Sequence, residues 1–246
     1  MKIYIISLPG AASRRSHSAG QLQDANVEFE FFDAHTGQQA LANGYEGRID
    51  HKRWLLDTGR DSTPAEIGCF SSHRALWARC VEMDEPLMIM EDDFDLSDRF
   101  AEAVHETERA IDKFGFIRLQ TERRARKRKV QRCGDMTLVC YTKAPHSLMC
   151  YAIGPRLARS LVDRTETMDA PVDVVVKKYW EFDHALYGLM PYSVDESHLS
   201  PDSCIPSRLK TKKNLITGIR RVTTKMSWHV RRIRFNFSQS SRSTGS

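Results

Sequence analysis

Four carboxylates lie within five residues of this chain, directly after the apolar run 87–90: Glu91, Asp92, Asp93 and Asp95. Like charges at that density repel one another, and the repulsion costs stability in a folded protein. A hard divalent cation with oxygen ligands is the natural group to offset them. A cation held by only a few carboxylates usually completes its coordination with substrate phosphates. The cluster therefore points to a phosphorylated or nucleotide-linked substrate, whereas the alternative is a solvated acidic loop that caps the following helix.

The elements around this cluster read as alternating strands and helices. Apolar or alternating segments predict strands over 2–8, 27–32, 87–90, 116–119, 137–141 and 149–153. Helical spacing predicts helices over 13–23, 63–83, 98–114, 155–163 and 172–187, with a long loop containing short helical turns over 35–62. This alternation predicts an α/β domain with a mainly parallel sheet. Ligands bind such sheets at the carboxyl ends of the strands, where the acidic cluster lies.

The helix over 63–83 has the clearest start signal. Thr63 can be its N-cap, Pro64 occupies the first helical position, and Glu66 completes a capping box. If the chain stays extended after position 90, Glu91, Asp93 and Asp95 point to one side and Asp92 to the other. One side would then face a metal and a diphosphate, and the other a sugar or ribose hydroxyl.

Composition indicates a globular chain, since 41% of the 246 residues are hydrophobic and 28% are charged, enough for a sizeable core. The apolar run 3–6 is too short for a signal peptide, and no apolar stretch approaches the roughly 18 residues of a spanning helix. None of the six cysteines forms a CxxC pair, as expected for reduced thiols. These features together predict a cytoplasmic protein.

Charge is divided unevenly along the chain. Residues 203–246 contain 11 Lys/Arg and no Asp/Glu, so residues 1–202 carry 26 basic and 32 acidic side chains, a net charge of −6. In the tail, apolar residues recur every three or four positions, as on one face of a helix: Leu215, Ile219, Val222, Met226, Val230, Ile233 and Phe237. A basic amphipathic helix of this kind lies in the interface of an anionic membrane, while the alternative is a helix packed on its own domain.

We therefore predict a catalytic domain over 1–205, a basic amphipathic membrane-surface helix over 206–237, with membrane contact through 214–237, and a disordered Ser-rich tail over 238–246. The protein would associate peripherally with the inner face of the cytoplasmic membrane. A second basic segment, 123–132, holds seven basic side chains. It is open to three interpretations: a solvated loop, a surface that attracts an anionic acceptor, or a nucleic-acid or nuclear-localisation segment.

Three segments read together carry a resemblance to a known family: the strand Ile3-Tyr4-Ile5-Ile6-Ser7-Leu8 with the later Arg14-Arg15, the segment Glu66-Ile67-Gly68-Cys69-Phe70-Ser71-Ser72-His73, and Met88-Ile89-Met90-Glu91-Asp92-Asp93-Phe94. They resemble the family 25 glycosyltransferases, which include bacterial lipopolysaccharide and lipooligosaccharide galactosyltransferases and the galactosyltransferases acting on collagen. The similarity covers about residues 2–205. It implies a GT-A fold with a Rossmann-like sheet, a UDP-sugar donor, a divalent metal (Mn²⁺ or Mg²⁺) and an inverting reaction.

The resemblance also implies roles for individual residues. Asp93 is expected to contact the metal, and Asp92 or Glu91 the ribose or sugar. Ser72 and His73 are expected to line the donor site, although a lone helical His is often a structural residue. The family often has Asn-Leu-x-Arg after its first strand, whereas this chain has Ser7-Leu8-Pro9-Gly10. Ser7, Leu8 and either Arg14 or Arg15 are therefore the candidates for binding the nucleotide.

Glycosyl transfer needs leaving-group stabilisation and a base for the acceptor hydroxyl. Asp173, in a family-like Pro-x-Asp segment at a helix start, is the first candidate base; the alternative is a carboxylate favoured there by the helix dipole. Asp169 and His184 are further candidates. His198 is a candidate late-sequence metal ligand, or else an exposed loop histidine.

The resulting prediction is a metal-assisted transferase that moves a sugar, in our interpretation galactose, from a UDP-sugar to a lipopolysaccharide or lipooligosaccharide acceptor. One alternative is a metal-dependent phosphoesterase, which would need further closely spaced His/Asp ligands. The other is a nucleic-acid-binding protein, which the absence of aromatic residues within 123–132 disfavours.

Overall fold

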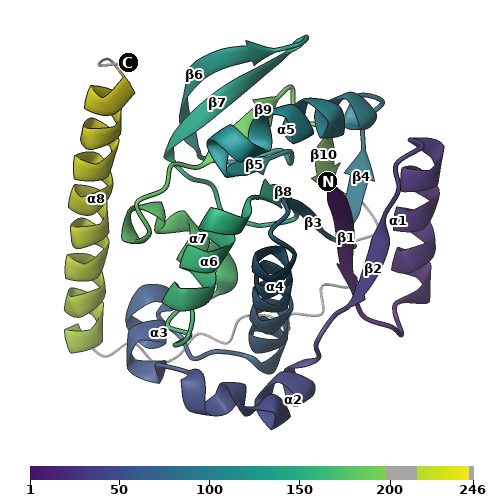
Figure 1. Ribbon diagram of the computed structural model, residues 1–246. Helices are drawn as coiled ribbons and strands as arrows, with labels where there is room; N and C mark the ends of the chain where they lie inside the picture. The colour runs from purple at the N-terminus through teal and green to yellow at the C-terminus, as the bar shows by residue number, and fades with distance from the viewer. Residues whose placement is uncertain (198–214, 244–246) are drawn as a thin grey trace.

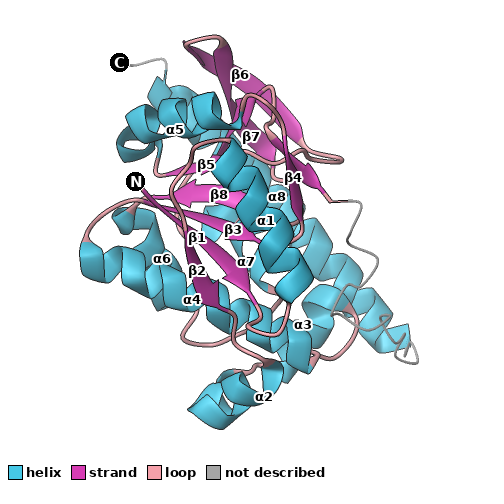
Figure 2. Ribbon diagram, turned by 90° about the vertical axis from the view of Figure 1, so that its right-hand side faces the viewer, coloured by secondary structure: helices cyan, strands magenta, loops and turns pink. Residues whose placement is uncertain are grey.

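Helices cover both faces of one large sheet in the computed structural model, which describes residues 1–197 and 215–243 (Figures 1 and 2). The strands are β1 (Lys2–Ser7), β2 (Glu30–Asp33), β3 (Leu87–Glu91), β4 (Phe94–Leu96), β5 (Phe116–Arg118), β6 (Arg126–Cys133), β7 (Met136–Lys143), β8 (Cys150–Ile153), β9 (Tyr187–Met190) and β10 (Val194–Glu196). The α-helices are α1 (Ala12–Asp24), α2 (Gly37–Ala40), α3 (His51–Thr58), α4 (Pro64–Met83), α5 (Phe100–Phe114), α6 (Pro155–Arg164), α7 (Val172–Lys177) and α8 (Leu215–Ser243).

The eight-stranded sheet has the order β2-β1-β3-β8-β5-β9-β7-β6, and β4 and β10 form a separate pair. Six strands point the same way, whereas β8 and β7 run antiparallel to both of their neighbours. The predicted α/β class with a mostly parallel orientation is therefore confirmed, with two reversed strands inserted. On one face lie α1 and α5, with Leu22 and Phe100 in their core; on the other lie α3, α4, α6 and α7, with Trp54 and Trp77.

Short-range signals account for the elements that were predicted well. Five of the six residues of β1 are buried, as expected for a central strand. At the start of α4, Thr63 Oγ1 accepts from the Glu66 N–H at 3.3 Å, and Glu66 Oε2 accepts from the Thr63 N–H at 3.1 Å. The predicted capping box, and the helix end at Met83, are confirmed.

The segment 35–62, predicted as a long loop with short helical turns, contains α2, a π-type turn (Leu41–Tyr45) and a 3₁₀ turn (Glu46–Arg48), and in addition the longer helix α3. The expected helix over 172–187 stops at Lys177 and is followed by a 3₁₀ turn (Tyr179–Glu181) and β9. The reason is tertiary, because Lys178 turns into the core, where its Nζ donates to Asp57 Oδ2 at 2.7 Å with both side chains fully buried.

Most of the basic segment 123–132 is a strand, β6, at the edge of the sheet. Its first seven residues are exposed. Lysine and arginine on an edge strand discourage pairing with another chain, which is a structural reason for this composition.

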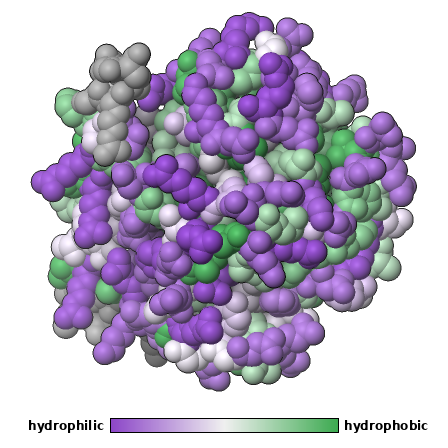
Figure 3. All heavy atoms as spheres, in the orientation of Figure 1, coloured by the Kyte–Doolittle hydropathy of each residue, from purple (hydrophilic) through white to green (hydrophobic). Residues whose placement is uncertain are grey.

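Helix α8 packs on the domain by one face and exposes its apolar stripe on the other. Phe235 is buried, and Asn236 Nδ2 donates to Thr142 O at 2.7 Å. The opposite face carries the predicted stripe, 47–77% exposed: Ile219, Val222, Met226, Val230, Ile233 and Phe237. The helix continues to Ser243, so residues 238–243 are helical rather than disordered. In Figure 3 purple hydrophilic side chains project along the left edge, where α8 lies in Figure 1.

No helix in 1–197 or 215–243 combines the length and the apolar character needed to cross a membrane.

Candidate active site

Three parallel strands bring their carboxyl ends to one edge of the sheet. In the register, Ser7 of β1 lies beside Asp33 of β2, and Ile6 beside Glu91 of β3. The acidic residues after β3 therefore meet the segment after β1, although 80 or more residues separate them in sequence. This is the edge at which α/β sheets bind ligands.

Asp92 turns toward β1, and its two carboxylate oxygens have different partners. Arg14 Nη1 lies 3.0 Å from Oδ1, and the Ser7 hydroxyl donates to Oδ2. Arg15 points elsewhere: its Nη2 donates to Ser7 O at 2.9 Å, its Nε donates to Leu8 O at 3.2 Å, and its guanidinium lies over the Phe31 ring. Of the two candidate arginines, Arg14 is thus the one tied to the acidic cluster.

Asp93 is the carboxylate of the cluster whose ionised form is disfavoured by its surroundings. Burial, followed by the charges of Glu91 and Asp92, raises its pKa to about 7, with Arg14 opposing the rise. Its Oδ1 atom is buried and has no hydrogen-bond partner. An unpartnered carboxylate oxygen among like charges suits a hard divalent cation, because the cation would offset both the burial and the repulsion. The residues present therefore fit the metal that the sequence predicts at Asp93.

Glu91 is held by a buried chain of polar groups. The Trp77 indole N–H donates to the Tyr151 hydroxyl at 2.9 Å, and that hydroxyl lies 2.9 Å from His73 Nδ1. Because an indole can only donate, the Tyr151 hydrogen is left for His73 Nδ1. His73 Nε2 then carries the proton and donates to Glu91 Oε1 at 3.2 Å.

Cys69 joins this group from the same side of α4. The ligand atoms of Cys69, His73 and Glu91 all lie within 4.8 Å of one another, a spacing that a metal ion would accept. However, burial, with the Glu91 and Asp173 charges, raises the pKa of the Cys69 thiol, so it stays protonated. Without a metal, the His73 imidazole donates to Glu91, which makes His73 a candidate positioning residue for that carboxylate.

The segment 66–73, which we call the α4 motif, also contains residues with structural roles. A Cβ atom at Gly68 would lie 2.4 Å from His35 O, so only glycine admits the loop that packs there. Ser72 Oγ donates to Gly68 O at 2.8 Å and accepts from the His35 N–H at 2.9 Å. Ser72 therefore anchors the loop instead of facing the cluster.

Asp173 lies at the first turn of α7 with His146 beside it. His146 Nδ1 is 3.2 Å from Asp173 Oδ2, and the Lys177 ammonium donates to His146 Nε2. Burial alone would raise the pKa of Asp173, but the His146 hydrogen bond and charge, with the Ser147 and Val174 N–H groups, hold it below its ordinary value. Asp173 is thus an ionised carboxylate within a short chain of proton-carrying groups.

Two cavities connect these groups; we call them the motif cavity, which members of the acidic cluster line, and the Asp173 cavity. The motif cavity, of about 1310 Å³, is lined by Glu91, Asp93, Asp95, Gln120, Thr121, Glu122, Arg123, Arg124, Lys143, Ala144, Pro145, His146, Ser147, Met149, Lys177, Asp195, Glu196 and Ser197. The Asp173 cavity, of about 530 Å³, includes Asp173 and Cys69 and shares four residues with the first: Glu91, His146, Ser147 and Glu196. Acidic motif and candidate base therefore face adjoining spaces.

Several lining residues were not expected from the sequence. Asp195 and Glu196 reach the motif cavity because β10 pairs with β4, which places Asp195 opposite Asp95. Arg123 and Arg124, at the start of the basic segment, also line it. The adjacent carboxylates Asp195 and Glu196 are a weak signal in the sequence. Their approach to the acidic cluster, however, depends on a strand pairing between segments about 100 residues apart.

The other candidate bases have structural partners. Asp169 is buried and lies 2.6 Å from Arg164 and 3.5 Å from Lys178. His184 Nε2 donates to Phe114 O at 3.0 Å. Neither residue lines the motif cavity or the Asp173 cavity. His198 lies outside the described residues.

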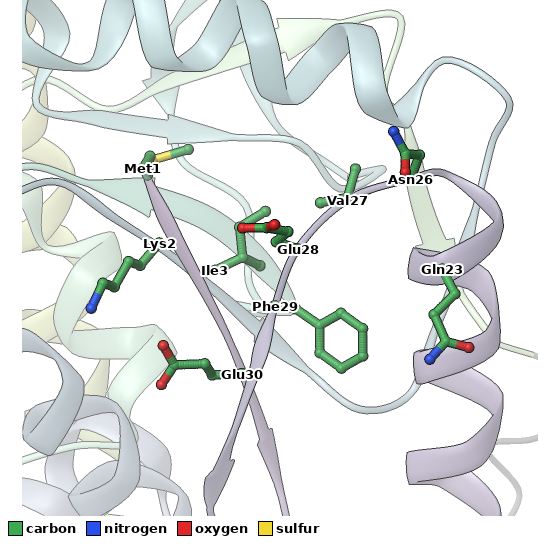
Figure 4. Close-up of a pocket in the computed structure, with 9 residues that line it drawn as sticks. All are labelled: Met1, Lys2, Ile3, Gln23, Asn26, Val27, Glu28, Phe29 and Glu30. Atoms are coloured by element: carbon green, nitrogen blue, oxygen red, sulfur yellow. The ribbon is translucent and has the colours of Figure 1, made fainter.

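Another pocket lies at the opposite ends of the strands (Figure 4). It has a volume of about 690 Å³ and is lined by the amino end of β1 and the segment before β2, including Lys2, Glu28 and Phe29. It contains no member of the acidic cluster and is therefore separate from the candidate site.

Comparison with known proteins decides the family. The profile of glycosyltransferase family 25 (LPS biosynthesis protein) matches residues 1–176. This chain belongs to glycosyltransferase family 25. The family match includes the acidic motif, the α4 motif and Asp173, whereas β9, β10 and α8 lie beyond it.

Individual relatives are similar over parts of the chain. The lipooligosaccharide biosynthesis protein lic2B of Haemophilus influenzae is 36% identical over 125 residues, covering 48% of this chain and 45% of that protein. A putative glycosyltransferase of the same species is 26% identical over 230 residues, covering 89% and 78%. The lacto-N-neotetraose biosynthesis glycosyltransferase LgtB of Neisseria gonorrhoeae is 31% identical over 98 residues, covering 38% and 32%. The chain thus spans less than half the length of the first and third of these relatives.

Proposed function

We propose that this family 25 protein is an inverting glycosyltransferase that moves galactose from UDP-galactose to a hydroxyl of a lipopolysaccharide or lipooligosaccharide acceptor. The single observation that carries the donor half of this proposal is the buried, unpartnered Oδ1 of Asp93 at the carboxyl edge of the sheet. The acceptor half rests on the relatives that are named for lipooligosaccharide biosynthesis.

A GT-A arrangement is part of this proposal. Its support is a sheet with helices on both faces, with the acidic motif directly after β3 and beside the end of β1. A nucleotide at that edge would meet the acidic motif from one side and Arg123 and Arg124 from another, since all of them line the motif cavity.

Mn²⁺ or Mg²⁺, held by Asp93 with Glu91, Asp95 or Glu196 nearby, would stabilise the diphosphate leaving group without proton transfer. Asp92 stays bound to Arg14 and Ser7 and keeps the turn in place. His73 orients the Glu91 carboxylate through Nε2. These residues together bind and orient the donor.

Asp173 is the proposed base for the acceptor hydroxyl. It is ionised, it lines a cavity together with Glu91, and His146 holds its Oδ2. His146, whose other nitrogen accepts from Lys177, favours the ionised form of Asp173 that a base requires. Asp169 and His184 are not proposed as bases, because salt bridges and a backbone carbonyl occupy them.

We also propose that α8 rests on an anionic membrane, at the cytoplasmic face. Its apolar stripe is exposed while the opposite face packs on the domain. Arg220, Arg231 and Arg234 are exposed on the same helix, and residues 203–246 contain no acidic side chain. Exposed apolar side chains flanked by arginine match an interfacial helix.

The transferase proposal is tested by calorimetric titration of UDP, UDP-galactose, UDP-glucose and UDP-N-acetylglucosamine, with and without Mn²⁺. We expect Mn²⁺-dependent binding of UDP-galactose to the wild type and its loss in Asp93→Asn. Asp135→Asn is the matched control, because this aspartate is 84% exposed in the β6–β7 turn. Binding of none of the four ligands would reject the proposed donor class.

A further inference from the structure

A fourth cavity, of about 300 Å³, lies between α7 and α8; we call it the α8 cavity. Among the residues lining it are Lys143, Lys177, Lys225, Arg232, Trp180 and Trp228. It shares Lys143, Ala144, His146 and Lys177 with the motif cavity, but none of that cavity's carboxylates. It therefore extends the site on the side of His146, beyond the acidic motif.

Positive charge gathers in the α8 cavity without a matching negative charge. Four lysine and arginine side chains line it, against one carboxylate, Asp57, whose Oδ2 already accepts from the buried Lys178. The pKa of Lys177 is lowered to about 8, chiefly by burial and also by the charges of Lys143, Arg232 and Lys225, against the opposing effect of Asp173. An oxyanion among these groups would remove the repulsion between them.

Aromatic rings complete the lining. Trp180 and Trp228 lie with ring centroids 6.4 Å apart and line the cavity together. The Trp180 Nε1–H is buried and has no hydrogen-bond partner. Flat apolar rings beside cations suit a ligand that has an apolar face as well as a negative group, which describes a sugar carrying a phosphate or a carboxylate.

We propose that the α8 cavity binds a sugar-borne oxyanion, a phosphate or carboxylate group of the acceptor. The cavity contacts the site through His146 and Lys177, the residues that form a chain to the candidate base Asp173, and not through the acidic motif. The assignment to the acceptor rests on the proposed function, whereas the binding of an oxyanion does not. The competing source of the same chemistry is the diphosphate of the donor.

The test measures the rate at which an amine-reactive ester acylates Lys177 and Lys225 at pH 7.5, quantified by peptide mass spectrometry. The exposed Lys129 on β6 is the internal reference. The probes are glucose 6-phosphate, glucuronate, neutral glucose, and UDP with Mn²⁺. We expect glucose 6-phosphate and glucuronate to slow the acylation of Lys177 several-fold, and glucose to have no effect.

Variants make the result specific. The pair Lys225→Gln and Arg232→Gln should abolish protection of Lys177, as should Lys143→Gln, which lies on β7 and leaves α8 intact. The pair Arg220→Gln and Arg231→Gln removes the same charge from the exposed side of α8 and should retain protection. Circular dichroism would verify that each variant is folded.

Three outcomes would overturn the proposal. Equal protection by glucose and glucose 6-phosphate, or no protection by any of the four probes, would show that the cavity does not select an oxyanion. Protection by UDP with Mn²⁺ but by neither anionic sugar would assign the lysines to the donor site. Because none of these readouts requires sugar transfer, the α8 cavity is tested independently of the proposed reaction.

Discussion

Replacing Asp93 by Asn should stabilise the metal-free protein while removing its metal site. The pKa of Asp93 rises from 3.8 to about 7 on folding, so the folded protein binds this proton more tightly than the unfolded chain does. The folded state therefore loses stability as the pH rises from about 4 to about 7, and the loss is complete above about 7. At 1.36 kcal/mol per pH unit, the full cost is about 4 kcal/mol.

Asparagine removes the charge but still buries a polar group, so we expect about 1–3 kcal/mol of that cost to be recovered. For a chain of this size, each kcal/mol changes Tm by about 2–4 °C. Asp93→Asn should therefore melt several degrees above the wild type at pH 8.5 in EDTA. At pH 5.5 most of the wild-type Asp93 is protonated, so the difference should shrink.

The assay is differential scanning fluorimetry at both pH values, with and without Mn²⁺. Mn²⁺ should raise the Tm of the wild type and leave that of Asp93→Asn unchanged, because only a ligand of the native state stabilises it. The exposed Asp135→Asn should match the wild type throughout. A lower Tm for Asp93→Asn at pH 8.5, or a gain of equal size at both pH values, would refute the argument from burial and repulsion.

Four further perturbations test the other parts of the site. His73→Gln can still offer an N–H toward Glu91 whereas His73→Asn cannot reach, so KM for the UDP-sugar should rise more in the Asn variant; equal effects would reject His73 as a positioning residue. Asp173→Asn should lower kcat by about 10²–10⁴-fold with Mn²⁺-dependent donor binding retained, and a kcat near that of the wild type would exclude it as the base. Arg123→Gln with Arg124→Gln should weaken substrate binding, since both line the motif cavity, whereas Arg126→Gln with Arg128→Gln on the exposed strand β6 should not; kinetics that rank the pairs in the opposite order would contradict the cavity assignment. Met226→Asp should reduce sedimentation with anionic vesicles far more than Ser227→Asp, which adds the same charge beside the 64% exposed Met226; similar losses would mean that charge alone binds the helix.

The structure changes how the tail should be tested. Deletion of 214–246 would remove Phe235 from the core and Lys225 and Arg232 from the α8 cavity, so it would not separate membrane contact from folding. Substitutions in the outward stripe leave the packed face of α8 intact. They therefore probe the membrane proposal without opening the domain.

Signals that act over a few residues could be read from the sequence. The capping box at Thr63 and the buried strand before Glu91 both depend on neighbours within one turn or one strand. The acidic cluster is also a local signal, and the cation that its charge density predicts remains a prediction for the Mn²⁺ experiments above. The α4 motif could be recognised by resemblance, but the task of Gly68, close contact with His35 O, could not.

The tertiary structure decided the features that depend on distant partners. Helix α7 ends early because Lys178 reaches Asp57, 121 residues away in sequence. His146 became part of the site only through its contact with Asp173, and Glu196 only through the pairing of β10 with β4. The spacing of the tail predicted an apolar face correctly, but spacing cannot tell which side of a helix packs on the domain. That choice followed from the inward contacts of Phe235 and Asn236, because a helix buries the face whose side chains find complementary partners.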